Sequence, residues 1–206
     1  MLGHRMRMTT VTSTDDPIDR LPAAGGDVAP GGADLNPHQP HRFRLAASAP
    51  DTYDGGTLRN ASEETFSILK GQDASVVLAH LEPGGIREPH WHPSAWEVNY
   101  VITGRLRFTA LETLGYWESF DAEAGDLVFL PQGGMHYFEN VGEDVASSLI
   151  VFNSSSREPR DDIGMVSALS VLASSVLGSL FGVPAEVFDR IPHNVRRIGI
   201  TRHTPR

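Results

Sequence analysis

Residues 84–97 read Gly-Gly-Ile-Arg-Glu-Pro-His-Trp-His-Pro-Ser-Ala-Trp-Glu, and this stretch carries the main clues to the fold and the function. Side chains two residues apart in a β-strand point to the same face, so we expect His90 and His92 to project together and Trp91 to project the other way. A Pro-Ser pair then interrupts the strand, and Glu97 falls on the next apolar run. The stretch therefore predicts two imidazoles and a carboxylate on neighbouring strands.

A second stretch, residues 125–140, reads Gly-Asp-Leu-Val-Phe-Leu-Pro-Gln-Gly-Gly-Met-His-Tyr-Phe-Glu-Asn. Pro131 and Gly133 are typical of a turn, and His136 follows that turn on a further strand. Side chains from neighbouring strands of a closed sheet can converge, so the three histidines and Glu97 are predicted to share one metal ion. A carboxylate buried among imidazoles would cost several kcal/mol without a cation. A barrel that has lost its metal and keeps the histidines as ordinary polar groups is the alternative.

The predicted ligands are His90, His92, Glu97 and His136, which offer three imidazole nitrogens and one carboxylate. With no thiolate, this set suits Mn²⁺ or Fe²⁺ and would also accept Zn²⁺, Ni²⁺ or Cu²⁺. An octahedral ion held by four protein atoms keeps two open positions. These are enough for a bidentate substrate, or for a substrate together with O₂ as a co-substrate.

Much of the remaining sequence has the pattern of short strands. Apolar or alternating runs recur at regular spacing, with Gly- and Asp-rich turns between them: Thr65–Leu69, Ala74–Leu81, Trp96–Ile102, Arg105–Leu111, Leu127–Leu130 and Ser147–Phe152. Over this part of the chain, apolar residues do not recur at the three- and four-residue spacing of an amphipathic helix. The pattern predicts an all-β fold, an antiparallel sandwich or barrel.

The composition changes at both ends of this region. Residues 1–40 are rich in Gly, Pro and Ala between positions 23 and 33 and cannot bury enough apolar surface to order themselves, so we predict a flexible, extended N-terminal arm. An arm that packs on a neighbouring subunit is the alternative. The β-barrel is expected over residues 41–155. A lid-like loop, amphipathic helices and a tail are expected over residues 156–206.

The C-terminal part carries apolar residues at three- and four-residue steps from Met165 to Leu180, which predicts an amphipathic helix. Gly182 is expected to end this helix, and Pro184 to open a short second one. Such a helical segment either covers one end of a barrel or docks on a partner subunit. We therefore predict a homodimer or a higher homo-oligomer.

The composition excludes several classes of function. The chain of 206 residues contains no cysteine, which rules out disulfides, iron–sulfur clusters, zinc–thiolate sites and a cysteine nucleophile. Its formal charge of −9 argues against nucleic acid as a partner. We see no membrane-spanning stretch and no apolar leader at the N-terminus, so the expected location is the cytoplasm, without a membrane partner.

The two stretches match, at every fixed position, the paired signatures of the cupin superfamily, G-x5-H-x-H-x4-E-x6-G and G-x5-P-x-G-x2-H-x3-N. The chain is therefore identified as a member of that superfamily. The resemblance implies a double-stranded β-helix, the jelly-roll barrel of cupins, with one metal ion at its centre.

Within the superfamily, residues 83–92 resemble oxalate decarboxylase, which implies a small carboxylate as the substrate. In that family an arginine just before the first histidine pairs with a substrate carboxylate, a role that would fall to Arg87. A rim arginine paired with Glu88 or Asp126 is the alternative. A lid glutamate donates the proton in those enzymes. The corresponding segment here, residues 154–162, lacks the family's lid sequence but offers Glu158, followed by Pro159. A solvated loop whose charges pair on the surface is equally open.

The resemblance leaves three functions open. The leading one is a Mn²⁺-dependent enzyme of the oxalate decarboxylase type, although those enzymes carry two cupin domains and this chain has one. Oxidation of oxalate, or another dioxygenase reaction at the same site, is a close rival. A cupin that binds a metal and a small ligand without turnover is the third, because a fold does not fix a function.

Overall fold

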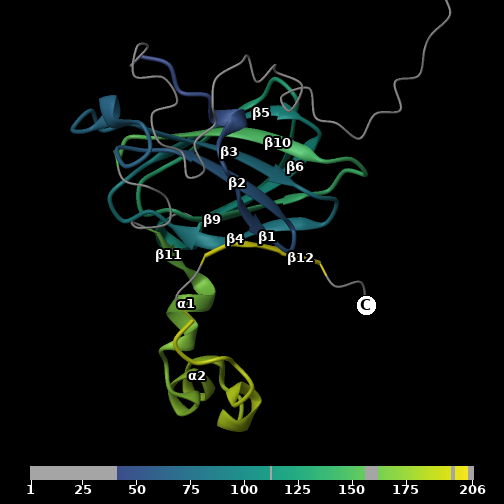
Figure 1. Cartoon of the computed structure of the whole chain (residues 1–206). Coiled ribbons are helices and arrows are strands. Elements are labelled where there is room, and N and C mark those ends of the chain that lie inside the picture. The colour runs from purple at the N-terminus through teal and green to yellow at the C-terminus, as the bar shows by residue number, and fades with distance from the viewer. Residues whose placement is uncertain (1–40, 112, 156–161, 196–197, 204–206) are drawn as a thin grey trace, which may run out of the picture.

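The computed structural model describes residues 41–111, 113–155, 162–195 and 198–203, so the predicted N-terminal arm lies outside the described residues. Two antiparallel sheets face each other and enclose the core (Figure 1). The all-β jelly-roll fold expected from the turn pattern and the cupin signatures is confirmed. Among the described residues, no helix combines the length and the apolar character that a membrane crossing requires.

The first sheet runs in the order β1 (Asp51–Tyr53), β2 (Gly56–Ala61), β3 (Ser75–Leu81), β10 (Ala146–Phe152), β5 (Glu97–Thr103) and β8 (Leu127–Leu130). The second runs in the order β11 (Ile163–Gly164), β4 (Gly85–Trp91), β9 (Met135–Asn140), β6 (Arg105–Leu111) and β7 (Trp117–Glu123). A last strand, β12 (Ile200–Arg202), also pairs with β4. Segments far apart in the chain therefore meet on β4.

The core between the sheets is built from the alternate side chains of the central strands. Phe108 of β6 and Phe138 of β9 are fully buried, and their ring centroids lie 5.1 Å apart. Leu81 and Ile150 line the facing sheet. Burying each such side chain contributes about 1.5–3 kcal/mol, so this layer holds the two sheets together. The polar residues of the site sit within the same interior.

Glycines with left-handed backbone mark the turns at the two ends of the first cupin signature. Gly84 and Gly104 have φ values of 73° and 78° and flank β4 and β5, respectively. Residues with a side chain rarely adopt this conformation, which explains why glycine stands at both turns. These turns fix the register in which the ligand-bearing strands meet.

Short helices complete the fold: η1 (Leu45–Ala47), η2 (Ser67–Leu69), η3 (Thr113–Gly115), α1 (Met165–Ser170), α2 (Ser174–Phe181) and η4 (Ala185–Phe188). The strand predicted at Thr65–Leu69 was wrong, because η2 occupies this segment. Thr65 is the reason: its Oγ1 accepts a hydrogen bond from the N–H of Ser62 at 3.0 Å, and the N–H of Phe66 donates to the carbonyl of Ser62. Such local bonds stabilise a turn in place of a strand ladder.

The C-terminal helix is broken into two parts, contrary to the single helix that we predicted. Ser170 ends α1: its hydroxyl donates to the carbonyl of Ser167 and accepts from the N–H of Val195, at 2.9 and 3.0 Å. Gly182, with φ 68°, ends α2 as predicted. We call residues 165–191 the helical extension. It projects away from the second sheet (Figure 1) and does not cover an end of the barrel, the first of the two roles that we considered.

Candidate metal centre

Strand β4 carries an irregularity that turns two functional side chains toward the barrel interior. Arg87 pairs with Phe138 of β9, whereas His90 pairs with His136, so β4 contains one residue more than β9 over this interval. Residues three apart in a regular strand point to opposite faces, and one extra residue restores a common face. Arg87 and His90 are accordingly both buried, each with 1% of its surface exposed.

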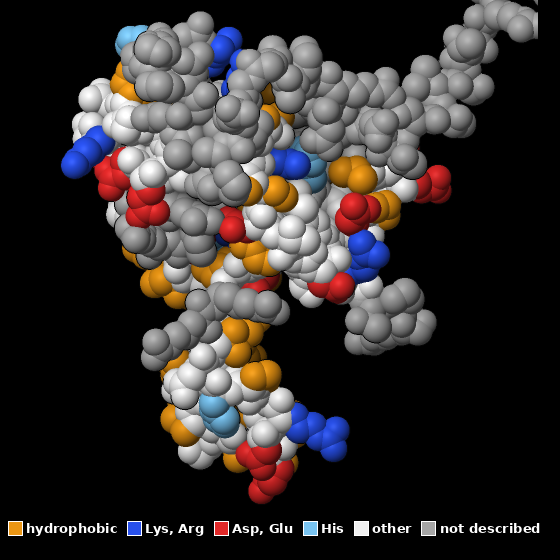
Figure 2. Space-filling view, in the orientation of Figure 1, with side chains coloured by type: hydrophobic (Ala, Val, Ile, Leu, Met, Phe, Trp, Pro, Cys, Tyr) orange, Lys and Arg blue, Asp and Glu red, His pale blue; other side chains and the backbone are white. Residues whose placement is uncertain are grey.

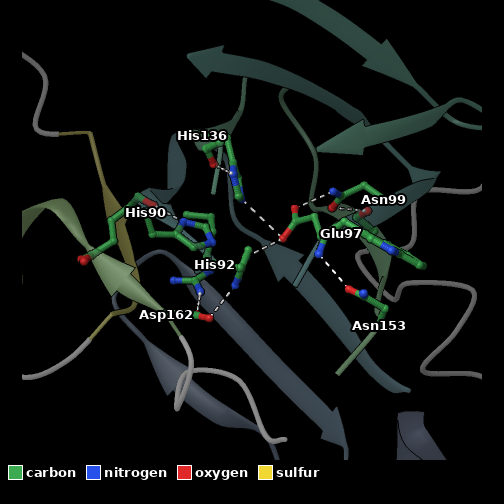
Figure 3. Close-up of polar contacts among 12 residues, drawn as sticks. His90, His92, Glu97, Asn99, His136, Asn153 and Asp162 are labelled. Carbon is green, nitrogen blue, oxygen red and sulfur yellow. Dashed lines mark hydrogen bonds and ion pairs between the residues drawn. The ribbon is translucent and has the colours of Figure 1, made fainter. Parts of the chain in front are cut away.

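The remaining predicted ligands reach the same place from both sheets. His92 follows directly on β4, and His136 stands near the start of β9, next to β4. The N–H of Gly133 donates to the carbonyl of His92 at 2.9 Å, which ties the turn before β9 to the end of β4. Glu97 opens β5 in the opposite sheet. Figure 3 shows the four side chains pointing toward one another.

The four donor atoms form a compact group. His90, His92, Glu97 and His136 each offer one nitrogen or oxygen, and these atoms all lie within 4.8 Å of one another. All four residues are buried. The rings of His90 and His136 are the nearest pair, with centroids 4.4 Å apart. This separation and this mixture of donors suit a single divalent transition ion.

Hydrogen bonds on the far side of each ring decide which nitrogen faces the centre. Nδ1 of His90 donates to the carbonyl of Glu88 at 2.7 Å, and Nδ1 of His136 donates to the carbonyl of Gly134 at 2.9 Å. The proton on Nδ1 leaves Nε2 with a lone pair. Both Nε2 atoms are buried and lack a hydrogen-bond partner within the described structure. Buried acceptors of this kind are costly unless they bind a cation, so the site fits a metal ion.

Glu97 is held in place by a neighbour on its own strand. The side-chain amide of Asn99 donates to Oε1 of Glu97 at 2.6 Å. Oε2 is turned toward the imidazoles, 2.9 Å from Nε2 of His92 and 3.4 Å from Nε2 of His136. Asn99 is fully buried and also lies 3.4 Å from the hydroxyl of Ser148. The hydrogen bond from Asn99 therefore orients the carboxylate of Glu97 toward the imidazoles even without a bound ion.

The electrostatics of the chain by itself indicate that the centre needs positive charge. Burial would raise the pKa of Glu97, but His136 and His92 hold that pKa well below its usual range. Burial lowers the pKa of His92, but hydrogen bonds to Asp162 and Glu97 outweigh it and raise the pKa to about 10. Burial and the charge of Arg87 lower the pKa of His90, which stays neutral. In the chain alone, a proton on His92 supplies the charge that a metal ion would supply.

Arg87 lies in the interior and not on the rim. Its Nη2 donates to Oδ2 of Asp162 at 3.0 Å, and its Nη1 lies 3.5 Å from the carbonyl of Gly199. The side chain of Asp162 is itself buried, with 2% of it exposed, although this residue was expected as part of a solvated loop.

Two residues of the site escaped the sequence analysis, and one predicted residue is not described. Asn99 could have been suspected because it lies two residues after Glu97 and so shares its face. Asp162 gave no signal, because it ends a polar run that looks like a solvated loop. Glu158, the predicted proton donor, lies outside the described residues.

Comparisons with known proteins agree with this geometry. The Cupin family model matches residues 43–188. The oxalate decarboxylase OxdC of Bacillus subtilis (strain 168) is 34% identical over 113 residues, which cover 55% of this chain and 29% of that protein. An oxalate decarboxylase of Arthroderma benhamiae is 31% identical over 137 residues, covering 66% and 31%. Germin-like protein 3-7 of Oryza sativa subsp. japonica is 30% identical over 159 residues, covering 74% and 66%.

Solved structures give the same result. The structure of oxalate decarboxylase from Bacillus subtilis at pH 4.6 superposes with a TM-score of 0.70 and 25% identity, covering 79% of this chain and 41% of that one. The chain spans about a third of the length of the oxalate decarboxylases that it matches. The family match extends over most of the chain, from before β1 to the end of η4. The chain therefore belongs to the cupin family.

Proposed function

We propose that this protein is a metal-dependent enzyme of the oxalate decarboxylase type, which uses Mn²⁺ to cleave the carbon–carbon bond of oxalate. The observation that carries the proposal is the grouping of three imidazoles and one carboxylate with a buried arginine inside one barrel. Similarity to oxalate decarboxylases over the barrel supports the choice of substrate. Fe²⁺ is the next candidate for the native ion.

In this proposal the residues of the chain have separate tasks. His90, His92, Glu97 and His136 hold the ion, with Nε2 of each imidazole directed inward. When bound, the ion would supply Lewis-acid and one-electron redox chemistry, in which O₂ can take part without being consumed in the decarboxylation. Arg87 binds and orients a substrate carboxylate, because its planar guanidinium matches the two carboxylate oxygens. The buried surroundings exclude water and strengthen this ion pair.

The proposed reaction consumes no net oxidant. The monoanion of oxalate gives up its acidic proton and its carbon–carbon bond is cleaved; one carbon leaves as CO₂, and the other takes one proton in return to become formate. We assign Glu158 as the acid that donates this proton. Glu158→Gln removes the transferable proton and keeps the shape, so formate production should fall sharply while metal binding is retained.

Oxidation of oxalate is the second candidate, and one sequence feature favours it. The segment that contains Glu158 lacks the lid sequence of the decarboxylases, and a proline, Pro159, directly follows Glu158. Without a proton donor, the monoanion of oxalate, one O₂ and one proton would give two CO₂ and one hydrogen peroxide. In this case Glu158→Gln would leave the activity intact.

The test begins with metal analysis of protein purified without added ions. The Mn²⁺-loaded protein is then incubated with oxalate at mildly acid pH, and formate, CO₂ and hydrogen peroxide are quantified. One formate and one CO₂ per oxalate would support decarboxylation, and peroxide would favour oxidation. Tight binding of oxalate without product over hours would show a binding protein and contradict both. His136→Ala, which removes one ligand, is the control for activity from free metal.

We also propose that the protein forms a homodimer or a higher homo-oligomer through the helical extension. Apolar side chains of this segment are exposed to solvent: Val171, Val176, Leu180, Phe181 and Val187. Figure 2 shows hydrophobic side chains distributed over this projecting part of the molecule. Exposed apolar surface of this extent on a projecting element is typical of a protein–protein contact.

A further inference from the structure

The three imidazoles of the metal centre are not held in the same way. His90 and His136 are fixed by backbone carbonyls two residues away, within or next to their own strands. His92 instead donates from Nδ1 to Oδ1 of Asp162, 2.6 Å away and seventy residues later in the chain. The orientation of His92 therefore depends on a segment outside the strands that carry the ligands.

The same carboxylate also holds the buried arginine. Oδ2 of Asp162 accepts a hydrogen bond from Nη2 of Arg87 at 3.0 Å, while Oδ1 accepts from His92. Figure 3 shows Asp162 beside the ring of His92, with the two dashed contacts leaving its carboxylate. One side chain thus links the metal centre to the residue that we assign to the substrate carboxylate.

The backbone around Asp162 brings it close by a specific route. The next two residues form β11, in which Gly164 pairs with His90 on the edge of β4. A Cβ atom at Gly164 would lie 2.5 Å from Oε1 of Glu88 and 2.7 Å from Cγ1 of Ile198, so any other residue there would force these two side chains to move. The carboxylate of Asp162 is thereby carried into the interior, where 2% of it is exposed.

We propose that Asp162 is a positioning residue that sets the tautomer and orientation of His92 and fixes the fork of Arg87. A carboxylate can accept from both donors at once, and its acceptance from Nδ1–H leaves Nε2 of His92 free to bind the ion. The claim that Asp162 fixes Arg87 for the substrate rests on the proposed function. The claim that Asp162 orients His92 depends on metal binding alone.

Asparagine at this position keeps one of the two contacts, because it has one acceptor and one donor group. If the amide oxygen of Asp162→Asn faces His92, the contact to His92 is kept and the amide N–H₂ faces the donors of Arg87. If the amide N–H₂ faces His92, Nδ1 must become the acceptor and the proton moves to Nε2, the atom that the ion needs. Alanine removes both contacts in every case, so Asp162→Ala is the variant that tests the proposal.

The first experiment measures binding of Mn²⁺ by isothermal titration calorimetry, without oxalate. We expect Asp162→Ala, which removes the contact to His92, to weaken the binding of Mn²⁺ by about 10–100-fold. Asp121→Ala is the matched control, because Asp121 also binds an arginine side chain, Arg107, but on the surface. That control should leave the affinity unchanged. Equal affinities for the native protein and Asp162→Ala would overturn the proposal.

A second measurement uses the native protein, so that a folding defect in the variant cannot obscure the result. In the Zn²⁺-loaded, ¹⁵N-labelled protein, the Nδ1–H proton of His92 should appear strongly downfield, as expected for a short hydrogen bond to a carboxylate. Finding the proton on Nε2, or finding Nδ1–H exchanging as in an exposed histidine, would overturn the proposal. Neither measurement involves oxalate, so a failure of the proposed function would be seen separately, as a native protein that binds metal normally but yields no product.

Discussion

Nε2 of His92 and Oε2 of Glu97 lie 2.9 Å apart inside the barrel, where both side chains are almost completely shielded from solvent. Two lone pairs at this distance repel each other unless a positive charge lies between or beside them. A proton can supply that charge and so can a divalent ion, but both need the same atom, Nε2 of His92. Metal and proton therefore compete for one position, and the first prediction follows from this competition.

Binding of a metal ion should release one proton from His92. The pKa of His92 in the chain alone is raised from 6.5 to about 10, so the ring is protonated at neutral pH and must lose its proton to bind the ion. The apparent affinity for Mn²⁺ should therefore rise about tenfold per pH unit between about pH 7 and 9. Titration calorimetry in buffers with different ionisation enthalpies measures the released proton. An affinity that is independent of pH in this range would contradict the prediction.

Arg87→Lys should weaken the binding of the carboxylate substrate without weakening the binding of metal. Lysine keeps the charge but loses the planar fork, and one charge-assisted hydrogen bond is worth about 1.5–3 kcal/mol, so KM for oxalate should rise roughly 10–100-fold. Arg107→Lys on β6 is the matched control, since that arginine pairs with Asp121 at the surface. Steady-state kinetics and metal titration on both variants provide the comparison. An unchanged KM for oxalate in Arg87→Lys would show that Arg87 does not bind the substrate carboxylate.

Gly104→Ala should destabilise the protein more than Gly125→Ala. Both glycines have positive φ, 78° and 101°, so alanine is strained at either position. At Gly104 a Cβ atom would also lie 2.7 Å from Cβ of Ala146, whereas nothing lies within 4 Å at Gly125. We expect the free energy of unfolding to fall by about 1–2 kcal/mol in Gly125→Ala and by about 2–4 kcal/mol in Gly104→Ala. Urea unfolding followed by fluorescence measures both, and equal losses would refute the steric part of this argument.

Leu180→Glu should reduce the mass of the protein in solution while leaving its secondary structure intact. The side chain of Leu180 is 69% exposed on α2, so a charge there disturbs no packing within the subunit but would disrupt an apolar contact between subunits. Multi-angle light scattering measures the mass, and circular dichroism checks the fold. Leu127→Glu is the control, because Leu127 is 68% exposed on β8 in the first sheet. A native protein that is already monomeric would exclude the proposed oligomer.

The sequence predicted those parts of the molecule that depend on short-range regularity. The two-residue period of a strand explains why the side chains of His90 and His92 point into the same part of the barrel. Gly84 and Gly104 stand at turns and have left-handed backbone. Most predicted strands were found with small changes in their ends. The strand predicted at residues 65–69 was wrong because a threonine side chain can satisfy a backbone N–H and stabilise a turn instead.

The parts that could not be predicted depend on contacts between distant segments. Asp162 ends a polar run and becomes buried only because β11 pairs with β4, a contact set by tertiary structure. The break between α1 and α2 has a similar cause, since the hydroxyl of Ser170 binds the N–H of Val195 further along the chain. Hydrophobic periodicity carries no information about such bonds.

The irregularity of β4 has a consequence for how this chain can vary. Because an odd number of steps separates Arg87 from His90, the two side chains share the interior only while the strand stays irregular between them. Deleting either Glu88 or Pro89 would leave them two steps apart, the spacing at which a regular strand already points both side chains to one face. A shorter strand could therefore keep the centre by losing the irregularity, whereas straightening the present strand at its full length would turn the guanidinium or the imidazole out into water.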